Sequence, residues 1–158
     1  MYFTKTEIAI LKVFCSKITE SFSIREVSVI IKQNYSIVYS AVQNLYEKGY
    51  LNKNKHRTFS LNYGKNYQDL AYIESLRAEE FLSKNKNIDL FAKELLEKTK
   101  LGFFSLLLFG SYAKGKASKN SDIDILMIIE NLKDIENVER HIQQISEKYG
   151  NFHCNVIS

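Results

Sequence analysis

The sequence has few of the residues that define several protein classes. Its 158 residues contain two cysteines, no proline and no tryptophan. Cys15 and Cys154 lie in separate apolar stretches, so we expect buried, reduced thiols, not a disulfide framework or a zinc site. The absence of proline excludes little.

Long apolar runs are also missing. No stretch reaches the roughly 18 apolar residues that a membrane span needs, and no signal peptide is visible. We therefore expect a soluble, cytoplasmic protein with no membrane partner. Two small domains are about the limit for 158 residues, and because each core would be modest, a homodimer is expected.

A glycine-serine pair follows a short apolar run in the second half of the chain. Residues 103–109 are almost all apolar and are bounded by glycines, which favours a strand buried on both faces. Gly110 lets the backbone approach a ligand closely, and Ser111 could open a short helix whose N–H groups face phosphate oxygens. Lys114 and Lys116 add positive charge nearby. The pattern predicts a phosphate-binding turn.

Two alternating aspartates begin the next apolar run, residues 122–129. In a strand, Asp122 and Asp124 share one face, with Cα atoms about 6.6 Å apart at roughly 3.3 Å per residue. Carboxylates placed in this way can hold Mg²⁺ together with substrate phosphates.

These pieces resemble the polymerase-β-like nucleotidyltransferase superfamily: Gly110-Ser111, a ten-residue spacer (112–121), and Asp122-x-Asp124. GSYAKG followed by SDIDI is most similar to the minimal nucleotidyltransferases, which include adenylyltransferase antitoxins that act on a partner toxin. The resemblance implies a small mixed-sheet domain that transfers AMP from ATP to a hydroxyl of a protein, such as a toxin, or of a small molecule. It assigns catalysis and Mg²⁺ binding to Asp122 and Asp124, and nucleotide binding to Gly110, Ser111 and Lys114.

The family also uses a third carboxylate on a later strand. After an amphipathic stretch, residues 133–149, and the turn Gly150-Asn151, Asn155 stands where that acid is expected, with His153 nearby. Asparagine cannot act as a general base. Either the site has lost turnover or the chain lacks further elements. The alternative function is a DNA-binding transcriptional regulator whose degenerate nucleotidyltransferase domain senses a nucleotide.

Helix signals dominate the first part of the chain. Helical spacing predicts helices over residues 4–17, 23–33 and about 36–48, the first two opened by Thr4/Glu7 and Ser23/Glu26 capping boxes. Gly49 ends the third helix. Residues 50–61 read as a hairpin with a basic tip. The expected inward-facing side chains of the first two helices are Ile8, Leu11, Phe14, Val27, Ile30 and Ile31.

Three helices and a basic hairpin resemble a winged helix-turn-helix domain. The resemblance makes residues 36–48 the DNA-recognition helix and the hairpin a phosphate-binding wing. The implied DNA contacts are Ser36, Tyr39, Ser40, Gln43, Lys53, Lys55 and Arg57. Residues 1–66 carry ten Lys and Arg against four Asp and Glu, a net charge of +6, whereas residues 67–158 carry twelve against fourteen, a net charge of −2. Winged helices also serve as dimerisation or docking modules, and that alternative stays open.

The domain order follows from these segments. The sequence predicts an α+β protein: a winged helix-turn-helix domain over 1–66, a connecting helix over 67–86, and a small mixed-sheet nucleotidyltransferase-like domain over 87–158 that opens with a helix at 88–99.

Overall fold

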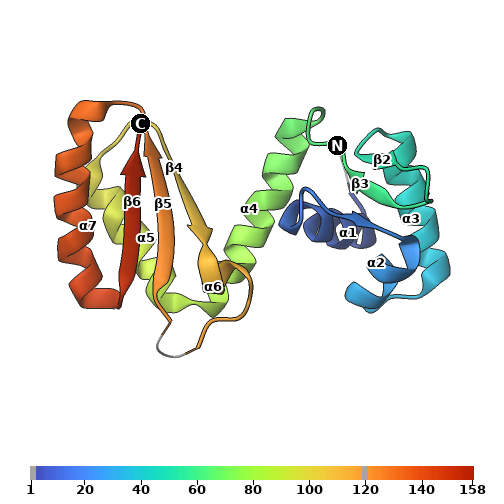
Figure 1. Cartoon of the computed structure of the whole chain (residues 1–158), viewed down its shortest axis with the longest axis horizontal. Helices are drawn as coiled ribbons and strands as arrows, with labels where there is room; N and C mark the ends of the chain where they lie inside the picture. Colours follow the sequence, from blue (N-terminus) through green and yellow to red (C-terminus); the bar gives the residue numbers. More distant parts are fainter. Residues whose placement is uncertain (1–2, 119–120) are drawn as a thin grey trace. The chain divides into compact units, whose positions relative to one another are not determined.

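The computed structural model describes residues 3–118 and 121–158, and these divide between Phe81 and Leu82 into an N-terminal and a C-terminal unit. The described residues form seven α-helices and two sheets, the α+β composition expected from the sequence (Figure 1). Lys119 and Asn120, in the spacer between the glycine-serine pair and the aspartates, lie outside the described residues.

All three expected helices of the N-terminal unit are present. They are α1 (Lys5–Ser16), α2 (Ile24–Ile30) and α3 (Tyr35–Glu47). Both capping boxes form: the Thr4 hydroxyl accepts from the Glu7 N–H while the Glu7 carboxylate accepts from the Thr4 N–H, and Ser23 and Glu26 do the same. These side chains satisfy amide groups that have no partner within the helix, which fixes where each helix starts.

Helix α2 is shorter than its apolar pattern indicated. The chain leaves the helix after Ile30 and turns at Lys32, whose φ is 53°. The expectation that Ile30 faces inward is wrong, because it lies on this last turn with 48% of its surface exposed, whereas Val27 is buried. Ile31 is only partly buried against the core.

The expected hairpin is confirmed. Strands β2 (Leu51–Lys53) and β3 (Phe59–Leu61) pair antiparallel, with Lys53 opposite Phe59. The N–H of Asn54 donates to the Thr58 carbonyl at 2.8 Å and closes the loop. Strand β1 (Ser21–Phe22) pairs with the other edge of β3. The sequence does not predict β1, because two residues are too few to show an alternating pattern.

The core of the N-terminal unit lies between the helices and this sheet. Its fully buried side chains include Ile10, Leu11, Phe14, Val38, Val42 and Leu45. Helix α4 (Tyr67–Lys84) adds Leu70 and Ile73. The Tyr50 hydroxyl donates to the Asp69 carboxylate at 2.6 Å, and burial together with this bond raises the pKa of Tyr50 to about 12.

A buried carboxylate connects α1 to α3. Glu7 is 1% exposed and accepts hydrogen bonds from Asn44 Nδ2 at 2.7 Å and from Lys48 Nζ at 3.2 Å. Burial raises the pKa of Glu7, but the hydrogen bonds from Thr4 and Lys48 outweigh it and leave the pKa below its ordinary value. The capping residue of α1 therefore also fixes the last turns of α3.

The C-terminal unit contains a mixed sheet, as the sequence predicted. Its strands are β4 (Phe104–Phe109), β5 (Ile123–Ile129) and β6 (Phe152–Ile157), and its helices are α5 (Lys86–Thr99), α6 (Gly110–Ala113) and α7 (Ile135–Tyr149). Strand β5 lies in the middle, antiparallel to β4 and parallel to β6. A short 3-10 helix, Leu132–Asp134, precedes α7.

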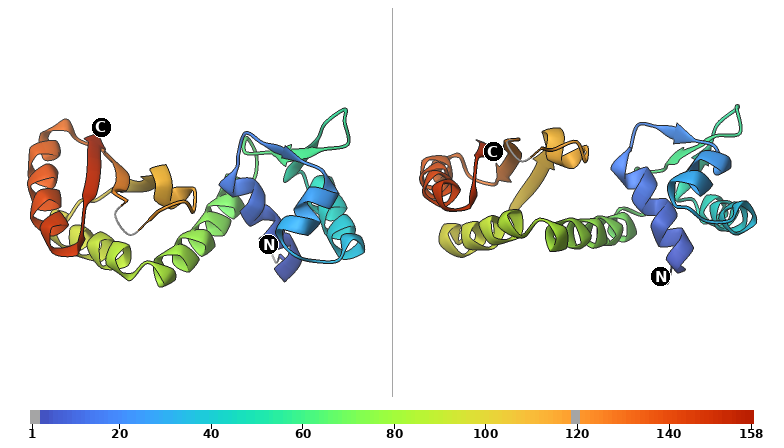
Figure 2. Two further views of the ribbon diagram at one scale, coloured as in Figure 1. Left: turned by 60° about the horizontal axis from the view of Figure 1, so that its bottom comes forward. Right: turned by 90° about the horizontal axis from the view of Figure 1, so that it is seen from below.

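Helices α5 and α7 cover one face of this sheet (Figure 2). The rings of Phe91 on α5 and Phe152 on β6 stack with centroids 3.8 Å apart. Glu94 connects the two helices, because it accepts from Lys148 Nζ at 2.7 Å and from the Tyr149 hydroxyl at 2.6 Å. These bonds, with one from Lys98, lower the pKa of Glu94 to about 2.

The other face of the sheet is open within this unit, which corrects the expectation that its strands are buried on both faces. Leu107, Phe109 and Ile157 are 46%, 42% and 46% exposed. The strands alternate between buried and more exposed positions because both helices pack on the same side. A short apolar run alone does not show how many faces are covered.

Both cysteines are free thiols. Cys15 is buried and Cys154 half-buried, and neither forms a disulfide. Burial raises their pKa values to about 12 and about 11, so both thiols stay protonated near neutral pH. Across the two described ranges, no helix combines the length and the apolar character needed to cross a membrane.

Replacing Glu7 by glutamine tests the connection between α1 and α3. We expect Glu7→Gln to lower the free energy of unfolding of the N-terminal unit by about 2 kcal/mol at pH 7, because hydrogen bonds to a buried charge are removed. Since the folded-state pKa is lowered, the stabilisation is present above the ordinary value of 4.5 and is lost as the pH falls through the folded value. Urea unfolding at pH 7 and pH 4, with amide exchange of α1 and α3, measures the effect.

Glu47→Gln is the matched control, since Glu47 is an exposed carboxylate of α3. It should change stability little at either pH. Equal stability of the Glu7→Gln and Glu47→Gln proteins at pH 7 would contradict the role of Glu7.

Candidate nucleotide and metal site

The glycine-serine turn follows directly on β4. Gly110 has a φ of +70° and begins the single-turn helix α6, the short helix that the sequence indicated. Ser111 is half-buried, and its carbonyl accepts from the Lys116 N–H at 2.9 Å. Lys114 is exposed immediately after α6. The turn therefore carries a hydroxyl and a lysine at the end of the edge strand β4.

Asp124 lies directly against this turn. In the antiparallel register, Asp124 is the cross-strand partner of Phe109, the residue before Gly110. A Cβ atom built on Gly110 would overlap the Oδ2 atom of Asp124. Any side chain at position 110 would therefore displace the carboxylate, and the positive φ independently favours glycine. The turn and the aspartate form one structural unit.

Asp122 and Asp124 lie on the open face of the sheet. Ile123 and Ile125 point into the core, so their neighbours at 122 and 124 point the other way, and both aspartates are half-buried. Asp122 Oδ1 accepts from Asn151 Nδ2 at 2.9 Å. The structure thus brings both predicted carboxylates to the face that carries the turn.

The neighbouring strand places His153, not Asn155, beside Asp124. Strand β6 runs parallel to β5, with Asp124 opposite His153 and Leu126 opposite Asn155. Both His153 and Asn155 are exposed, and Asn155 lies one row further from the turn. The sequence of β6, FHCNVI, contains no carboxylate. Strand β6 therefore supplies no third acid at the position beside Asp124.

The donor set fits a magnesium ion that a substrate helps to hold. Mg²⁺ in proteins is commonly bound by one or two carboxylates plus substrate phosphates and water. Asp122 and Asp124 provide such a pair next to the turn. Residues 3–118 and 121–158 contain no group of three His, Cys, Asp or Glu side chains able to form a complete metal cage.

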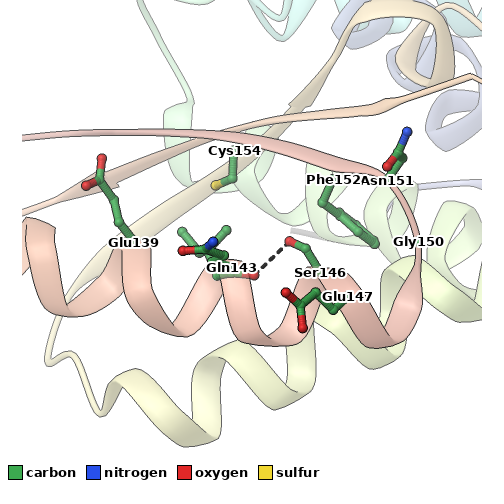
Figure 3. A pocket seen from close by; sticks show the side chains of 9 residues that line it. Glu139, Gln143, Ser146, Glu147, Gly150, Asn151, Phe152 and Cys154 are labelled. Carbon is green, nitrogen blue, oxygen red and sulfur yellow. Dashed lines mark hydrogen bonds between the residues drawn. The ribbon is translucent and has the colours of Figure 1, made fainter.

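Two hollows lie near the start of β6. One, of about 490 Å³, adjoins the turn and is lined by Asn87, Tyr112, Ser121, Ile123, Tyr149, Gly150 and Asn151. The other, of about 420 Å³, lies between α7 and β6 (Figure 3). Asn151 lines both. Neither Tyr112 nor Asn151 is among the site residues predicted from the sequence. Tyr112 follows Ser111 directly and could have been noticed, whereas nothing in the sequence pairs Asn151 with Asp122.

The residues expected to contact DNA all lie in the N-terminal unit. Ser36, Tyr39 and Ser40 are exposed on α3, and Gln43 is half-buried there. Lys53, Lys55 and Arg57 are exposed at the tip of the β2–β3 hairpin. Helix α3 also exposes Tyr35 and Ile37, at 53% and 54%.

Comparison with known proteins finds a family match within the C-terminal unit. Residues 88–153 match the family model described as a nucleotidyltransferase domain. Over 57 residues, the chain is 39% identical to "Putative protein adenylyltransferase MJ1305" from Methanocaldococcus jannaschii. That alignment covers 36% of this chain and 38% of the relative. Residues 88–153 are thus similar to nucleotidyltransferase domains, a family that implies a nucleoside triphosphate substrate and usually a divalent metal.

One solved structure has low similarity to this chain. It is TrmBL2, which its title describes as an archaeal chromatin protein with a novel mode of DNA binding. The alignment has 14% identity and a TM-score of 0.37, and it covers 98% of this chain and 63% of that chain.

Substituting Gly110 tests the contact with Asp124. We expect Gly110→Ala to weaken binding of Mn²⁺ and ATP together at least about tenfold, because the new methyl group displaces the carboxylate, and the groups that hold a metal ligand in place are typically worth 10–100-fold. Calorimetric titration of Mn²⁺ in the presence of a non-hydrolysable ATP analogue measures this binding.

Gly115→Ala is the matched control. Gly115 has a similar φ of +65°, but a Cβ there meets no atom within 4 Å. This variant carries only the backbone cost of an alanine in the left-handed region, roughly 1–2 kcal/mol of stability, and should bind Mn²⁺ and ATP normally. Equal loss of binding in the two variants would show that backbone strain, not the aspartate, explains the effect.

Proposed function

We propose that the C-terminal unit transfers a nucleoside monophosphate, AMP from ATP, to a hydroxyl group of a protein or a small molecule. The observation that carries this proposal is the contact between Gly110 and Asp124. It holds a carboxylate against the turn that would bind the triphosphate. The match of residues 88–153 and the relative named as an adenylyltransferase support the same chemistry.

The roles of the residues follow from their positions. The backbone and hydroxyl of Ser111 would contact the phosphates at the turn, and Gly110 would permit their close approach. Lys114 adds a compact positive charge that favours polyphosphate. Asp122 and Asp124 would hold Mg²⁺, which neutralises charge on the transferred phosphoryl group when it is bound. The open sheet face leaves room for an acceptor, for which a toxin protein is one candidate.

A different observation favours the alternative function, a regulator that binds a nucleotide without transferring it. Strand β6 places His153 beside Asp124 and contains no carboxylate. A domain without the third acid could bind a nucleotide without transferring it. The protein would then be a DNA-binding transcriptional regulator that senses a nucleotide.

We propose that the N-terminal unit is a winged helix-turn-helix domain that binds DNA in either case. Helix α3 would enter the major groove with Ser36, Tyr39, Ser40 and Gln43, and the β2–β3 hairpin would contact phosphates. The exposed lysines and arginine of the hairpin and the net charge of +6 over residues 1–66 support this assignment.

Incubation with Mg²⁺ and ATP labelled at the α-phosphate tests nucleotidyl transfer, with the product of a neighbouring gene as the acceptor. We expect the acceptor to become labelled. The rate of labelling should fall about a hundredfold or more in Asp124→Asn and Asp122→Asn, because removing a metal ligand should cost at least as much as removing the hydrogen bonds that support it. Glu130→Gln, an exposed carboxylate just beyond the far end of β5, is the control and should keep activity. Aspartate-dependent ATP binding without labelling would instead support the regulator.

A gel-shift salt series with the promoter of the protein's own gene tests DNA binding. We expect the triple variant Lys53→Ala/Lys55→Ala/Arg57→Ala to bind more weakly, with the slope of log affinity against log salt reduced by about 1 for each phosphate that the hairpin no longer binds. The control Lys5→Ala/Lys12→Ala/Lys17→Ala removes the same charge from the region of α1. Equal losses of DNA affinity in both triple variants would indicate a general charge effect and would contradict the assignment of the hairpin as a DNA-binding wing.

A further inference from the structure

The turn between α7 and β6 places Asn151 beside Asp122. Helix α7 ends at Tyr149, and Gly150, with a φ of 133°, redirects the chain. The carbonyl of Asn151 then accepts from the N–H of Ile123 at 2.8 Å. This bond belongs to the first pair of the parallel ladder, Ile123 with Phe152. The backbone of Asn151 is therefore fixed beside the first residue of β5.

The side chain of Asn151 makes a second bond to the same segment. Its Nδ2 donates to Asp122 Oδ1 at 2.9 Å. In Figure 3 the side chain points away from α7, whereas the ring of Phe152, one residue later, points toward it. The amide is thus anchored by its own backbone and directed at one oxygen of the carboxylate.

We propose that Asn151 is a positioning residue that orients the Asp122 carboxylate toward the cation and triphosphate at the turn. This inference rests on the proposed nucleotidyltransferase site. Asp122 stands just before β5, where the pairing of the strand does not fix its side chain. One N–H bond to Oδ1 sets the rotamer and leaves Oδ2 and one lone pair of Oδ1 for a cation.

The neutral amide suits this task better than a cationic side chain would. A lysine or arginine at position 151 would form an ion pair with Asp122 and compete with a metal ion for the same oxygens. An amide donor keeps the full negative charge of the carboxylate available. Hydrogen bonds that orient a metal-binding carboxylate typically change metal affinity 10–100-fold.

Mn²⁺ binding with a non-hydrolysable ATP analogue, followed by electron paramagnetic resonance, tests the role of Asn151. We expect Asn151→Ala to weaken Mn²⁺ binding about 10–100-fold. Asn151→Gln keeps the amide donor and should lose less Mn²⁺ affinity than Asn151→Ala. Gln143→Ala removes an exposed amide from α7 and should match the parent protein. Equal losses in the Ala and Gln variants, or parent-like binding by the Ala variant, would overturn the proposal.

A double-mutant comparison separates this role from general damage to the fold. In an Asp122→Asn background, Asn151→Ala should cause no further loss of Mn²⁺ binding, because its partner is already gone. Additive losses would mean that Asn151 acts independently of Asp122. Full Mn²⁺ affinity in Asp122→Asn itself would instead overturn the proposed metal site, and with it the positioning role. A parent-like thermal unfolding midpoint for Asn151→Ala confirms an intact fold.

Discussion

The contact between a glycine and a carboxylate organises the C-terminal unit. Because position 110 has no side chain, Asp124 on β5 can lie against the turn that ends β4. The antiparallel register of these strands sets this proximity, and the positive φ of Gly110 directs the chain into α6. The register of this strand pair therefore fixes the position of Asp124 relative to the turn at Gly110 and Ser111.

The rest of the unit makes that strand pair rigid on one side and accessible on the other. The stacked rings of Phe91 and Phe152 and the bonds of Lys148 and Tyr149 to Glu94 hold α5, α7 and β6 together. This packing occupies only the face of the sheet opposite the aspartates. The asymmetry leaves Asp122, Asp124 and His153 on the uncovered side, while Ile123 and Ile125 of the central strand are buried on the other.

The sequence predicted the parts of the structure that depend on local chemistry. Capping boxes at Thr4 and Ser23 located helix starts, and strict alternation placed Asp122 and Asp124 on one face. It did not predict features that depend on distant packing. The open sheet face depends on where both helices dock, and the position of His153 beside Asp124 depends on a parallel register set by the length of the α7 connection. The two-residue strand β1 was too short to leave a pattern.

The parallel pairing of β5 with β6 has a consequence for how the site comes into being. Asp122 and Asn151 are 29 residues apart in the chain, and the helical crossover that joins their strands must close before they meet. Closing such a loop requires conformational entropy to be lost before the interactions that compensate for it are made. During synthesis, the strand pair β4–β5 can assemble from residues already available. The hydrogen bond from Asn151 to Asp122 forms only when β6 has paired with β5, so a partly folded chain holds both aspartates without this contact.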